Sequence, residues 1–330
     1  MAGSVLVTGG AGYIGSVVVE ELLARGHRVI VLDNLSRGHR EAVAPGAVFV
    51  QGDVGDRAVL EDLFARHACD ALVHLAAFAL VAESVAEPRK YHANNVVAGR
   101  VLLEAAARAG VRRVVFSSSC AVYGYPPVTP IREDTPPAPV NPYGATKLEF
   151  EGLLARHAGD GITSVSLRYF NAAGATERLG EDHDPESHLI PNVLRVALGQ
   201  RPALEVYGHD YDTPDGTAVR DYIHVLDLAD AHVRAVDGRG EGDGRGATAV
   251  NLGTGTGYSV LAVVEAARRV TGHAIPIVKR PRRPGDPPQL VAATGRAAQL
   301  LGWRPRHSSL EEILASAWAW HQAHPHGYGN

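Results

Sequence analysis

The chain has 330 residues, of which 45% are hydrophobic and 21% charged, which is enough for about two domains with buried cores. Its 32 Lys and Arg residues against 36 Asp and Glu residues give a formal net charge of -4, which argues against a dedicated nucleic-acid binder or a polybasic membrane-surface protein. Two cysteines cannot form a disulfide framework, and no Cys and His residues stand at zinc-ligand spacing, so no metal is expected. Without a leader pattern or a run of about 18 apolar residues, we expect a soluble, cytoplasmic protein.

The first 170 residues alternate short β-branched runs with amphipathic helical stretches, the pattern typical of a parallel sheet covered on both faces. The predicted strands are 5–8, 28–33, 48–51, 71–75, 113–117 and 163–168. The predicted helices between them are 14–25, 58–67, 89–109 and 143–157. We therefore predict an α/β fold with a doubly wound parallel sheet of the Rossmann type.

The alternation stops near Asn171, where a polar and Gly-rich stretch begins. Shorter elements follow, and we predict a helix at 191–198, a strand at 204–207 and a helix at 225–236. The predicted division is a sheet domain at 1–172, rejoined by about 224–255, and a smaller second region within 173–330.

Three glycines follow the first predicted strand and precede a helix, at positions 9, 12 and 15. In this context Gly9 permits a tight turn, Gly12 lets the backbone approach a pyrophosphate, and Gly15 allows close packing of helix on strand. Asp33 ends the next strand, where a carboxylate can accept both ribose hydroxyls and would repel a 2′-phosphate, which favours NAD over NADP. Asp53 follows the third strand and can reach the adenine, although a simple turn aspartate explains it equally well.

A second motif lies at Asn141-Pro-Tyr-Gly-Ala-Thr-Lys147. Asn141 can cap a helix, so that Tyr143 and Lys147 lie one turn apart on one face. A neighbouring ammonium and the positive ring of an oxidised nicotinamide both favour the phenolate, so this pair can exchange a hydroxyl proton. The alternative is a surface tyrosine with a solvated lysine, but lysine occurs at only three positions of the chain, and a Ser-Ser-Ser run ending at Ser119 precedes the motif.

The chain resembles the extended short-chain dehydrogenase/reductase superfamily, because its motifs occur in that family's order. These are Thr8-Gly-Gly-Ala-Gly-Tyr-Ile-Gly15, Ser117-Ser-Ser-Cys-Ala-Val-Tyr123, Tyr143-Gly-Ala-Thr-Lys147 and Arg168-Tyr-Phe-Asn171. Within the superfamily the chain is similar to the UDP-glucose (UDP-galactose) 4-epimerases. That likeness covers essentially the whole chain and is carried by His209-Asp-Tyr-Asp-Thr-Pro-Asp-Gly-Thr, Val219-Arg-Asp-Tyr-Ile-His-Val225, Asn251-Leu-Gly and Arg283-Pro-Gly-Asp286.

The resemblance implies a role for each matching residue. Tyr143 would be the acid and base, Lys147 would bind the nicotinamide ribose and lower the pKa of the tyrosine, and Ser119 would orient the sugar 4-hydroxyl. The implied NAD-binding residues are Gly9, Gly12, Tyr13, Ile14, Gly15, Asp33, Asn34, Asp53, Val54, Asn95 and Tyr169. The implied UDP-sugar-binding residues are Phe170, Asn171, Leu189, Tyr207, Arg220, Arg283, Asp286 and Leu290. A homodimer through two helices of the first domain is also implied.

The implied reaction is reversible epimerisation at C4 of a UDP-hexose, UDP-galactose to UDP-glucose, through a transient 4-keto sugar and NADH. Alanine at Ala79 replaces a lysine common in the family, Cys120-Ala121 replaces an Ala-Thr pair, and Leu290 has intermediate size beside the sugar. UDP-GlcNAc or UDP-glucuronate therefore stay open as substrates. A 4,6-dehydratase would need an acid near Ser119, and a non-catalytic NAD sensor would need no Ser, Tyr and Lys set.

Overall fold

The computed structural model describes residues 3–238, 246–283 and 285–329. Its main feature is a sheet of seven parallel strands in the order β10-β6-β5-β4-β1-β2-β3. Their bounds are β1 Ser4–Thr8, β2 Arg28–Asp33, β3 Val48–Gln51, β4 Ala71–His74, β5 Arg113–Ser119, β6 Thr163–Tyr169 and β10 Ala247–Leu252. The predicted doubly wound parallel sheet is confirmed, and β10 returns from late in the sequence to pair with β6.

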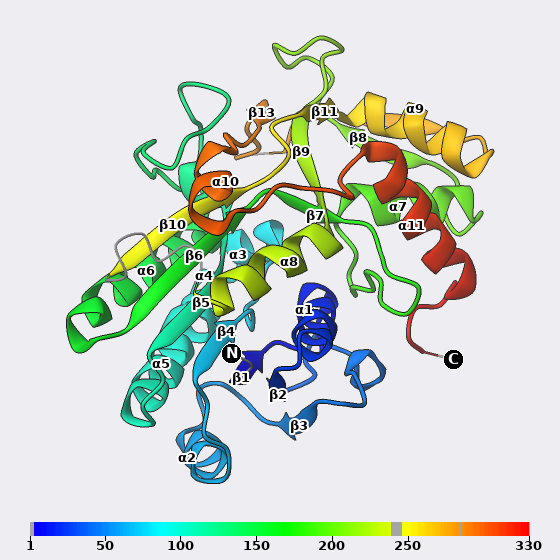
Figure 1. Cartoon of the computed structure of the whole chain (residues 1–330). Coiled ribbons are helices and arrows are strands. Elements are labelled where there is room, and N and C mark those ends of the chain that lie inside the picture. The colour runs from blue at the N-terminus through cyan, green and yellow to red at the C-terminus, as the bar shows by residue number, and fades with distance from the viewer. Residues whose placement is uncertain (1–2, 239–245, 284, 330) are drawn as a thin grey trace.

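Helices cover both faces of this sheet because successive strand side chains point to opposite sides. Val5 and Val7 of β1 pack in one core with α1 and α8, whereas Leu6 packs in the other core with α2, α5 and α6. These helices are α1 Tyr13–Ala24, α2 Arg57–Arg66, α5 Gly99–Arg108, α6 Pro142–His157 and α8 Val225–Val236. Figure 1 shows the sheet between α1 and α8 on one side and α5 and α6 on the other.

The predicted helix at 89–109 is confirmed as one continuous helical run, but its middle is π-helical. It consists of α4 Pro88–His92, the π-helical turn η2 Ala93–Ala98 and then α5, and the short helix α3 Val81–Ala86 precedes it. The π turn carries Asn95, whose amide is buried and bonded to the backbone of Phe78. Such turns occur frequently at functional sites, and hydrophobic periodicity does not reveal them.

The other predicted elements are confirmed with small shifts at their ends. The strands predicted at 113–117 and 163–168 extend to Ser119 and Tyr169, and the helix predicted at 191–198 is α7 Leu189–Ala197. The helix begins earlier because Pro191 lies in its first turn, where a missing N–H costs little. Short 3-10 turns occur at η1 Arg40–Ala42, η3 Cys120–Tyr123 and η4 Ala158–Asp160.

The second region contains two small sheets and a core of its own (Figure 1). β8 Leu204–Tyr207 pairs with β12 Ile277–Arg280, while β9 Val219–His224 lies among β7 Asn171–Ala173, β11 Gly257–Ser259 and β13 Gln289–Leu290. Three helices share the core, namely α7, α9 Val260–Thr271 and α11 Leu310–Ala323, and α10 Gly295–Leu301 packs toward the main sheet.

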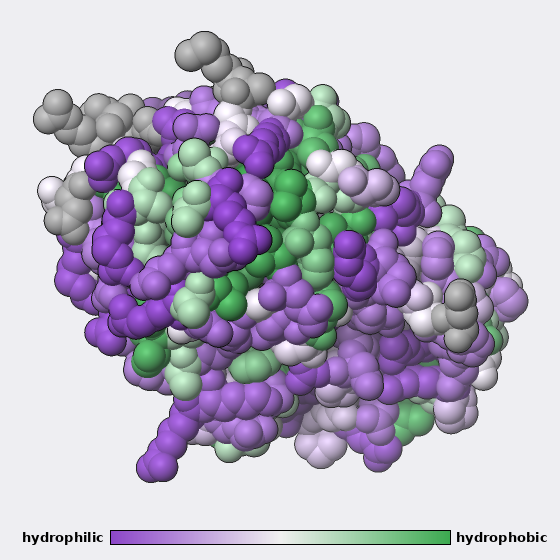
Figure 2. All heavy atoms as spheres, turned by 90° about the horizontal axis from the view of Figure 1, so that it is seen from below, coloured by the Kyte–Doolittle hydropathy of each residue, from purple (hydrophilic) through white to green (hydrophobic). Residues whose placement is uncertain are grey.

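The surface seen from below Figure 1 is mostly hydrophilic, with apolar residues gathered in a band near its centre (Figure 2). Across the described ranges, no helix combines the length and apolar composition needed to cross a membrane.

The side chain of Asp221 holds β9 in place against two other segments, and the neighbouring residue Arg220 lies on the same strand. Its carboxylate is fully buried and accepts hydrogen bonds from Thr254 N and Oγ1 at 2.8 and 2.7 Å, from Gly255 N at 3.0 Å and from Ala292 N at 3.1 Å. One side chain thereby joins β9 to the loop after β10 and to the residues after β13.

We expect Asp221→Asn to lower the free energy of unfolding by about 2–3 kcal/mol, because an amide has one acceptor oxygen and would turn an NH2 group toward backbone donors. Urea denaturation measures the change. The matched control is Asp212→Asn, at an exposed aspartate, which should leave the midpoint unchanged. Equal midpoints for both variants would contradict the role given to Asp221.

Candidate active site

The glycine-rich loop between β1 and α1 has no room for a side chain at Gly9 or Gly15. Gly9 has a φ of +73°, and a Cβ there would lie 2.6 Å from the backbone nitrogen of Ala76. A Cβ on Gly15 would overlap the carbonyl oxygen of Gly9, whereas one on Gly12 would meet only that oxygen, at 3.4 Å. Gly12 is also the N-cap of α1, so the first N–H groups of the helix have no side-chain cap and are available to an anion.

Acidic side chains lie at the ends of the two neighbouring strands. Asp33, at the end of β2, is buried and accepts hydrogen bonds from Ala11 N at 3.0 Å and Leu35 N at 2.9 Å. Asp53, after β3, accepts from the Asn34 amide at 2.9 Å. The carboxylate of Asp33 thus orders the glycine loop, and each of its oxygens keeps a second lone pair for a ribose hydroxyl. This loop and carboxylate fit a dinucleotide.

Other residues predicted to bind NAD have clear structural positions. The Asn95 amide pairs with Phe78 N and O at 2.9 and 3.0 Å and donates to Thr146 Oγ1 of α6 at 3.1 Å. The Tyr13 hydroxyl donates to Gly174 O at 2.6 Å, so this side chain joins the start of α1 to the second region. Val54 is buried in one core of the main sheet, and Ile14 packs against the other.

Ser119, Tyr143 and Lys147 come together where β5 ends and α6 begins. Asn141 caps α6 by accepting from Gly144 N at 2.8 Å, which fixes the first turn that carries Tyr143. Lys147 is buried and donates to Ser117 O at 2.7 Å, and its Nζ lies 5.7 Å from the centre of the Tyr143 ring. Ser119 hydrogen-bonds Tyr143 and accepts from Ala121 N at 3.1 Å. The structure therefore assembles the three residues predicted to form the catalytic set.

The protein's own groups do not lower the pKa of Tyr143 as the sequence suggested. Burial raises it above the ordinary value, the nearby Tyr169 raises it further, and the hydrogen bond from Ser119 acts in the opposite direction. Burial also lowers the pKa of Lys147 to about 7, against the attraction of Glu151. The groups of the chain alone therefore favour the neutral phenol.

A buried polar network beneath this set was not predicted. The Arg168 guanidinium forms two hydrogen bonds with the Glu151 carboxylate, which also accepts from Ser118 Oγ at 2.6 Å. Arg168 donates to Tyr123 OH at 2.9 Å as well. The network joins α6, β5 and β6, and the spacing of Glu151 one turn after Lys147 was the available signal in the sequence. In addition, Tyr169 hydrogen-bonds Ser117, and burial raises the pKa of Tyr169 to about 12.

The residues predicted to hold the diphosphate and uridine ribose lie close together in two pairs. Arg220 of β9 forms an ion pair with Asp286 and also donates to Pro287 O at 2.8 Å. The guanidinium of Arg283 stacks on the ring of Tyr207, 4.0 Å from its centre. These contacts connect the segment before β13 to both β8 and β9.

Two residues predicted to bind the UDP-sugar, Phe170 and Leu290, lie in a small apolar cluster. They are buried together with Cys120 and Tyr123, and the partly buried Leu148 of α6, the neighbour of Lys147, packs against them. Burial raises the pKa of the Cys120 thiol to about 12, so the environment favours the protonated, unreactive thiol.

Two further residues predicted to bind the substrate, Leu189 and Asn171, are linked to these residues only through neighbouring positions. Leu189 begins α7 and packs in the core that also contains Val206, the neighbour of Tyr207. Asn171 begins β7 and pairs with Tyr222 of β9.

We expect Lys147→Met to gain stability relative to the unchanged protein as the pH falls from about 10 to 7. The unfolded chain binds the lysine proton near its ordinary pKa of 10.5, but the folded chain binds it only near 7, so the folded state loses stability across this interval and no more below it. The difference should change by up to about 1.4 kcal/mol per pH unit. Urea unfolding of NAD-free protein across this range measures it. Lys279→Met, at an exposed lysine, is the control and should show no such trend.

Comparison with known proteins agrees with this geometry. Residues 5–253 match the family described as "NAD dependent epimerase/dehydratase family". The chain is 52% identical to the UDP-glucose 4-epimerase of Streptomyces lividans over 99% of both chains. The structure is similar to the Bifidobacterium longum UDP-glucose 4-epimerase in complex with NAD+ and UDP, with a TM-score of 0.94, 41% identity, and 98% and 100% of the two chains covered. The structure is also similar to the Brucella ovis UDP-glucose 4-epimerase in complex with NAD. The TM-score is 0.91, the identity is 48%, and 96% of this chain and 98% of the other are covered. The chain therefore belongs to the NAD-dependent epimerase/dehydratase family.

Proposed function

We propose that the protein is an NAD-dependent enzyme that interconverts UDP-galactose and UDP-glucose by epimerisation at C4. The observation that carries this proposal is the meeting of Ser119, Tyr143 and Lys147 at the edge of the sheet where the glycine loop also lies. Relatives of nearly the same length, at 47% and 52% identity, are UDP-glucose 4-epimerases. Ligands of open α/β sheets bind at this carboxyl edge of the strands.

The chain's own residues would position a dinucleotide through contacts along this edge. The N-terminus of α1 at Gly12 would bind the pyrophosphate, Asp33 the adenosine ribose, and Lys147 the nicotinamide ribose. Bound NAD+ supplies a reversible hydride acceptor for C4 and a positive ring charge that favours the phenolate of Tyr143.

Tyr143 would take the proton of the sugar 4-hydroxyl and later return it. Ser119, which hydrogen-bonds Tyr143, would hold the same oxygen in line with the phenol. Burial raises the pKa of Tyr143 in the protein alone, and the positive nicotinamide ring of bound NAD+ would favour its phenolate.

The second region would hold the UDP part firmly and the hexose loosely. Arg220, Asp286 and Arg283 offer charged groups for the diphosphate and the uridine ribose, with Tyr207 and Leu189 near the uracil. Around the hexose, Leu290, Phe170 and Cys120 offer mainly apolar surface, with few directional hydrogen bonds. A ring held in this way can turn and present its other face, while binding energy from the nucleotide prevents its release.

This assignment divides the chain by function. Residues 1–172 with about 224–255 would form the NAD-binding domain, and the rest of 173–330 would bind the UDP-sugar. Support comes from β10, which pairs with β6 in the main sheet, and from α8, which packs with α1.

The range of hexoses is tested directly by product analysis. UDP-galactose, UDP-GalNAc and UDP-galacturonate are incubated separately with the enzyme, and the products are resolved by chromatography. We expect UDP-galactose to be converted. Conversion of only one of the other two sugars would replace the proposed substrate by UDP-GlcNAc or UDP-glucuronate, and binding of NAD without any conversion would indicate a sensor.

Replacing Tyr143 by Phe removes the proton-transferring hydroxyl and keeps the ring. We expect Tyr143→Phe to lower turnover of UDP-galactose at least ~100-fold, the usual scale for loss of an acid–base group, while thermal unfolding shows an intact fold. Tyr125→Phe, at a tyrosine with 54% of its surface exposed, should keep full activity. Unreduced turnover of Tyr143→Phe would exclude the proposed base.

We further propose that the protein is a homodimer and works in the cytoplasm. Val81 and Val85 of α3 and Val97 of η2 have exposed fractions of 43%, 62% and 42%, which supports contact of this helical segment with a second copy. Both cysteines are free and buried, which suits a reducing compartment.

Light scattering during size-exclusion chromatography tests the dimer. We expect Val97→Glu to shift the protein to a monomer, because a carboxylate would have to be buried in the interface. The control is Val128→Glu, at a valine on another segment that is 69% exposed. This variant should stay dimeric. A dimer that is unaffected by Val97→Glu would place the interface elsewhere.

A further inference from the structure

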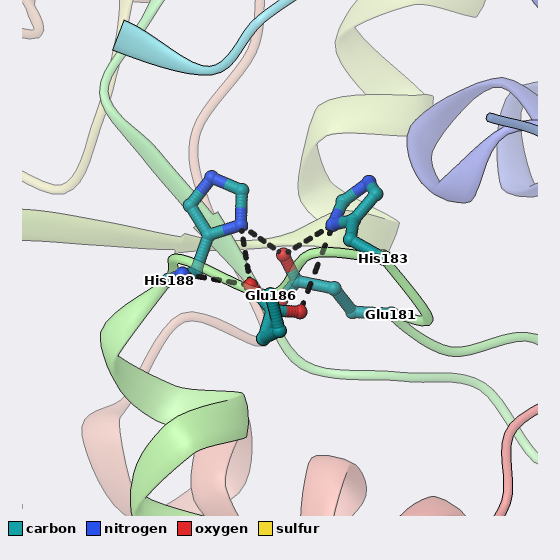
Figure 3. Close-up of side chains that lie close together, drawn as sticks. All are labelled: Glu181, His183, Glu186 and His188. Carbon is teal, nitrogen blue, oxygen red and sulfur yellow. Dashed lines mark hydrogen bonds and ion pairs between the residues drawn. The ribbon is translucent and has the colours of Figure 1, made fainter. Parts of the chain in front are cut away.

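Two carboxylates and two imidazoles converge in the loop between β7 and α7. They belong to Glu181, His183, Glu186 and His188, and one ligand atom from each lies within 4.8 Å of all the others. Figure 3 shows both Nδ1 atoms directed toward the carboxylate oxygens. From this arrangement we propose a site for a divalent transition-metal ion, with Zn²⁺ as the best match.

The separations between these atoms fit a single small ion. His188 Nδ1 lies 2.6 Å from Glu181 Oε1 and 3.2 Å from Glu186 Oε1. His183 Nδ1 lies 3.2 Å from Glu181 Oε1 and 3.8 Å from Glu186 Oε2. Zinc bound tetrahedrally at about 2.0–2.2 Å would separate its ligand atoms by about 3.4 Å, which falls within this range. Small side-chain adjustments would therefore complete the coordination.

Although these side chains form ion pairs with one another, three of the ligand atoms form no hydrogen bond within the described part of the chain, which is a second sign of a cation. The Glu186 side chain is fully buried. Among the described residues, nothing forms a hydrogen bond of good geometry with its Oε2, or with Nδ1 of His183 or His188. A buried carboxylate oxygen without a partner is costly, and a cation placed between these atoms would compensate all of them at once.

The donor set selects the class of metal. Imidazole nitrogen with carboxylate oxygen suits zinc and its first-row neighbours, whereas Ca²⁺ and Mg²⁺ prefer oxygen ligands alone. Two carboxylates with two neutral imidazoles carry a charge of about -2, which a divalent ion neutralises. The sequence prediction that no metal is present considered only Cys and His spacing, and the pattern Glu-x-His-x-x-Glu-x-His lies outside that search.

The position of the loop indicates what the metal would do. The His183 ring meets the Tyr13 ring edge-on at 6.3 Å, beside the glycine loop, and His188 immediately precedes Leu189 at the start of α7. Four protein ligands close the coordination sphere, as in structural zinc sites. The ion would thus hold the proposed uracil-binding helix against the proposed cofactor loop, a stabilising role beyond the proposed reaction.

Metal binding is tested on the complete enzyme with its cofactor. After EDTA treatment and buffer exchange, the protein is dialysed against ZnCl2, and bound metal is counted by mass spectrometry. We expect about one zinc per chain and a rise in Tm of about 5 °C. Glu186→Gln keeps the shape of the side chain and should weaken zinc binding at least ~100-fold. The matched control is Glu312→Gln, whose carboxylate pairs with His307 at an exposed position and should leave zinc binding unchanged.

A second ligand variant keeps the test decisive if Glu186→Gln does not fold. His183 is 27% exposed, so His183→Asn is expected to fold, and it should lose zinc and also the visible absorption of four-coordinate Co²⁺ seen in the parent enzyme. Zinc below about 0.1 per chain, or equal binding by the parent and both ligand variants, would overturn the proposal and leave a salt-bridge cluster. Zinc content is measured apart from UDP-galactose turnover, so failure here is distinct from failure of the proposed function.

Discussion

The buried ammonium of Lys147, bonded to the carbonyl of Ser117, is the contact on which the arrangement of the candidate active site depends. It fixes α6 against the end of β5, so that Tyr143 and Ser119 share one hydrogen bond. Burying a cation is unfavourable, and the Glu151 carboxylate one turn away offsets part of that cost while being held by Arg168. The catalytic geometry therefore depends on a chain of charges that reaches from α6 to β6.

Local patterns predicted the sheet and its cofactor loop well, because they reflect local physics. Short β-branched runs mark the strands in the sequence, and the bounds of β2, β3 and β8 match the prediction. The structure has no space for a Cβ at Gly9 or Gly15, and the glycines at these positions are visible in the sequence itself. The π turn around Asn95 was missed because it depends on pairing with Phe78, 17 residues away, which no periodicity encodes.

The remaining features arise from contacts distant in sequence. Arg220 and Asp286 are 66 residues apart, and Glu133 reaches Asn251 across 118 residues, so only a family likeness could suggest that Arg220 and Asp286 share a site. The direction of the pKa of Tyr143 was also beyond the sequence, because burial in the folded chain is its largest cause. The four side chains of the loop from Glu181 to His188 are close in sequence. Their convergence could be recognised only in the structure, which shows the directions of the side chains.

The return of β10 to the main sheet has a consequence for how the chain can be divided. β10 pairs with β6 along its whole length, from Ala247 opposite Ser164 to Leu252 opposite Tyr169. A fragment ending at residue 172 would leave the outer backbone groups of β6 open to solvent, as a template for strands of other molecules. Such a fragment should aggregate rather than fold as a free-standing nucleotide-binding unit, because residues 247–252 complete its sheet.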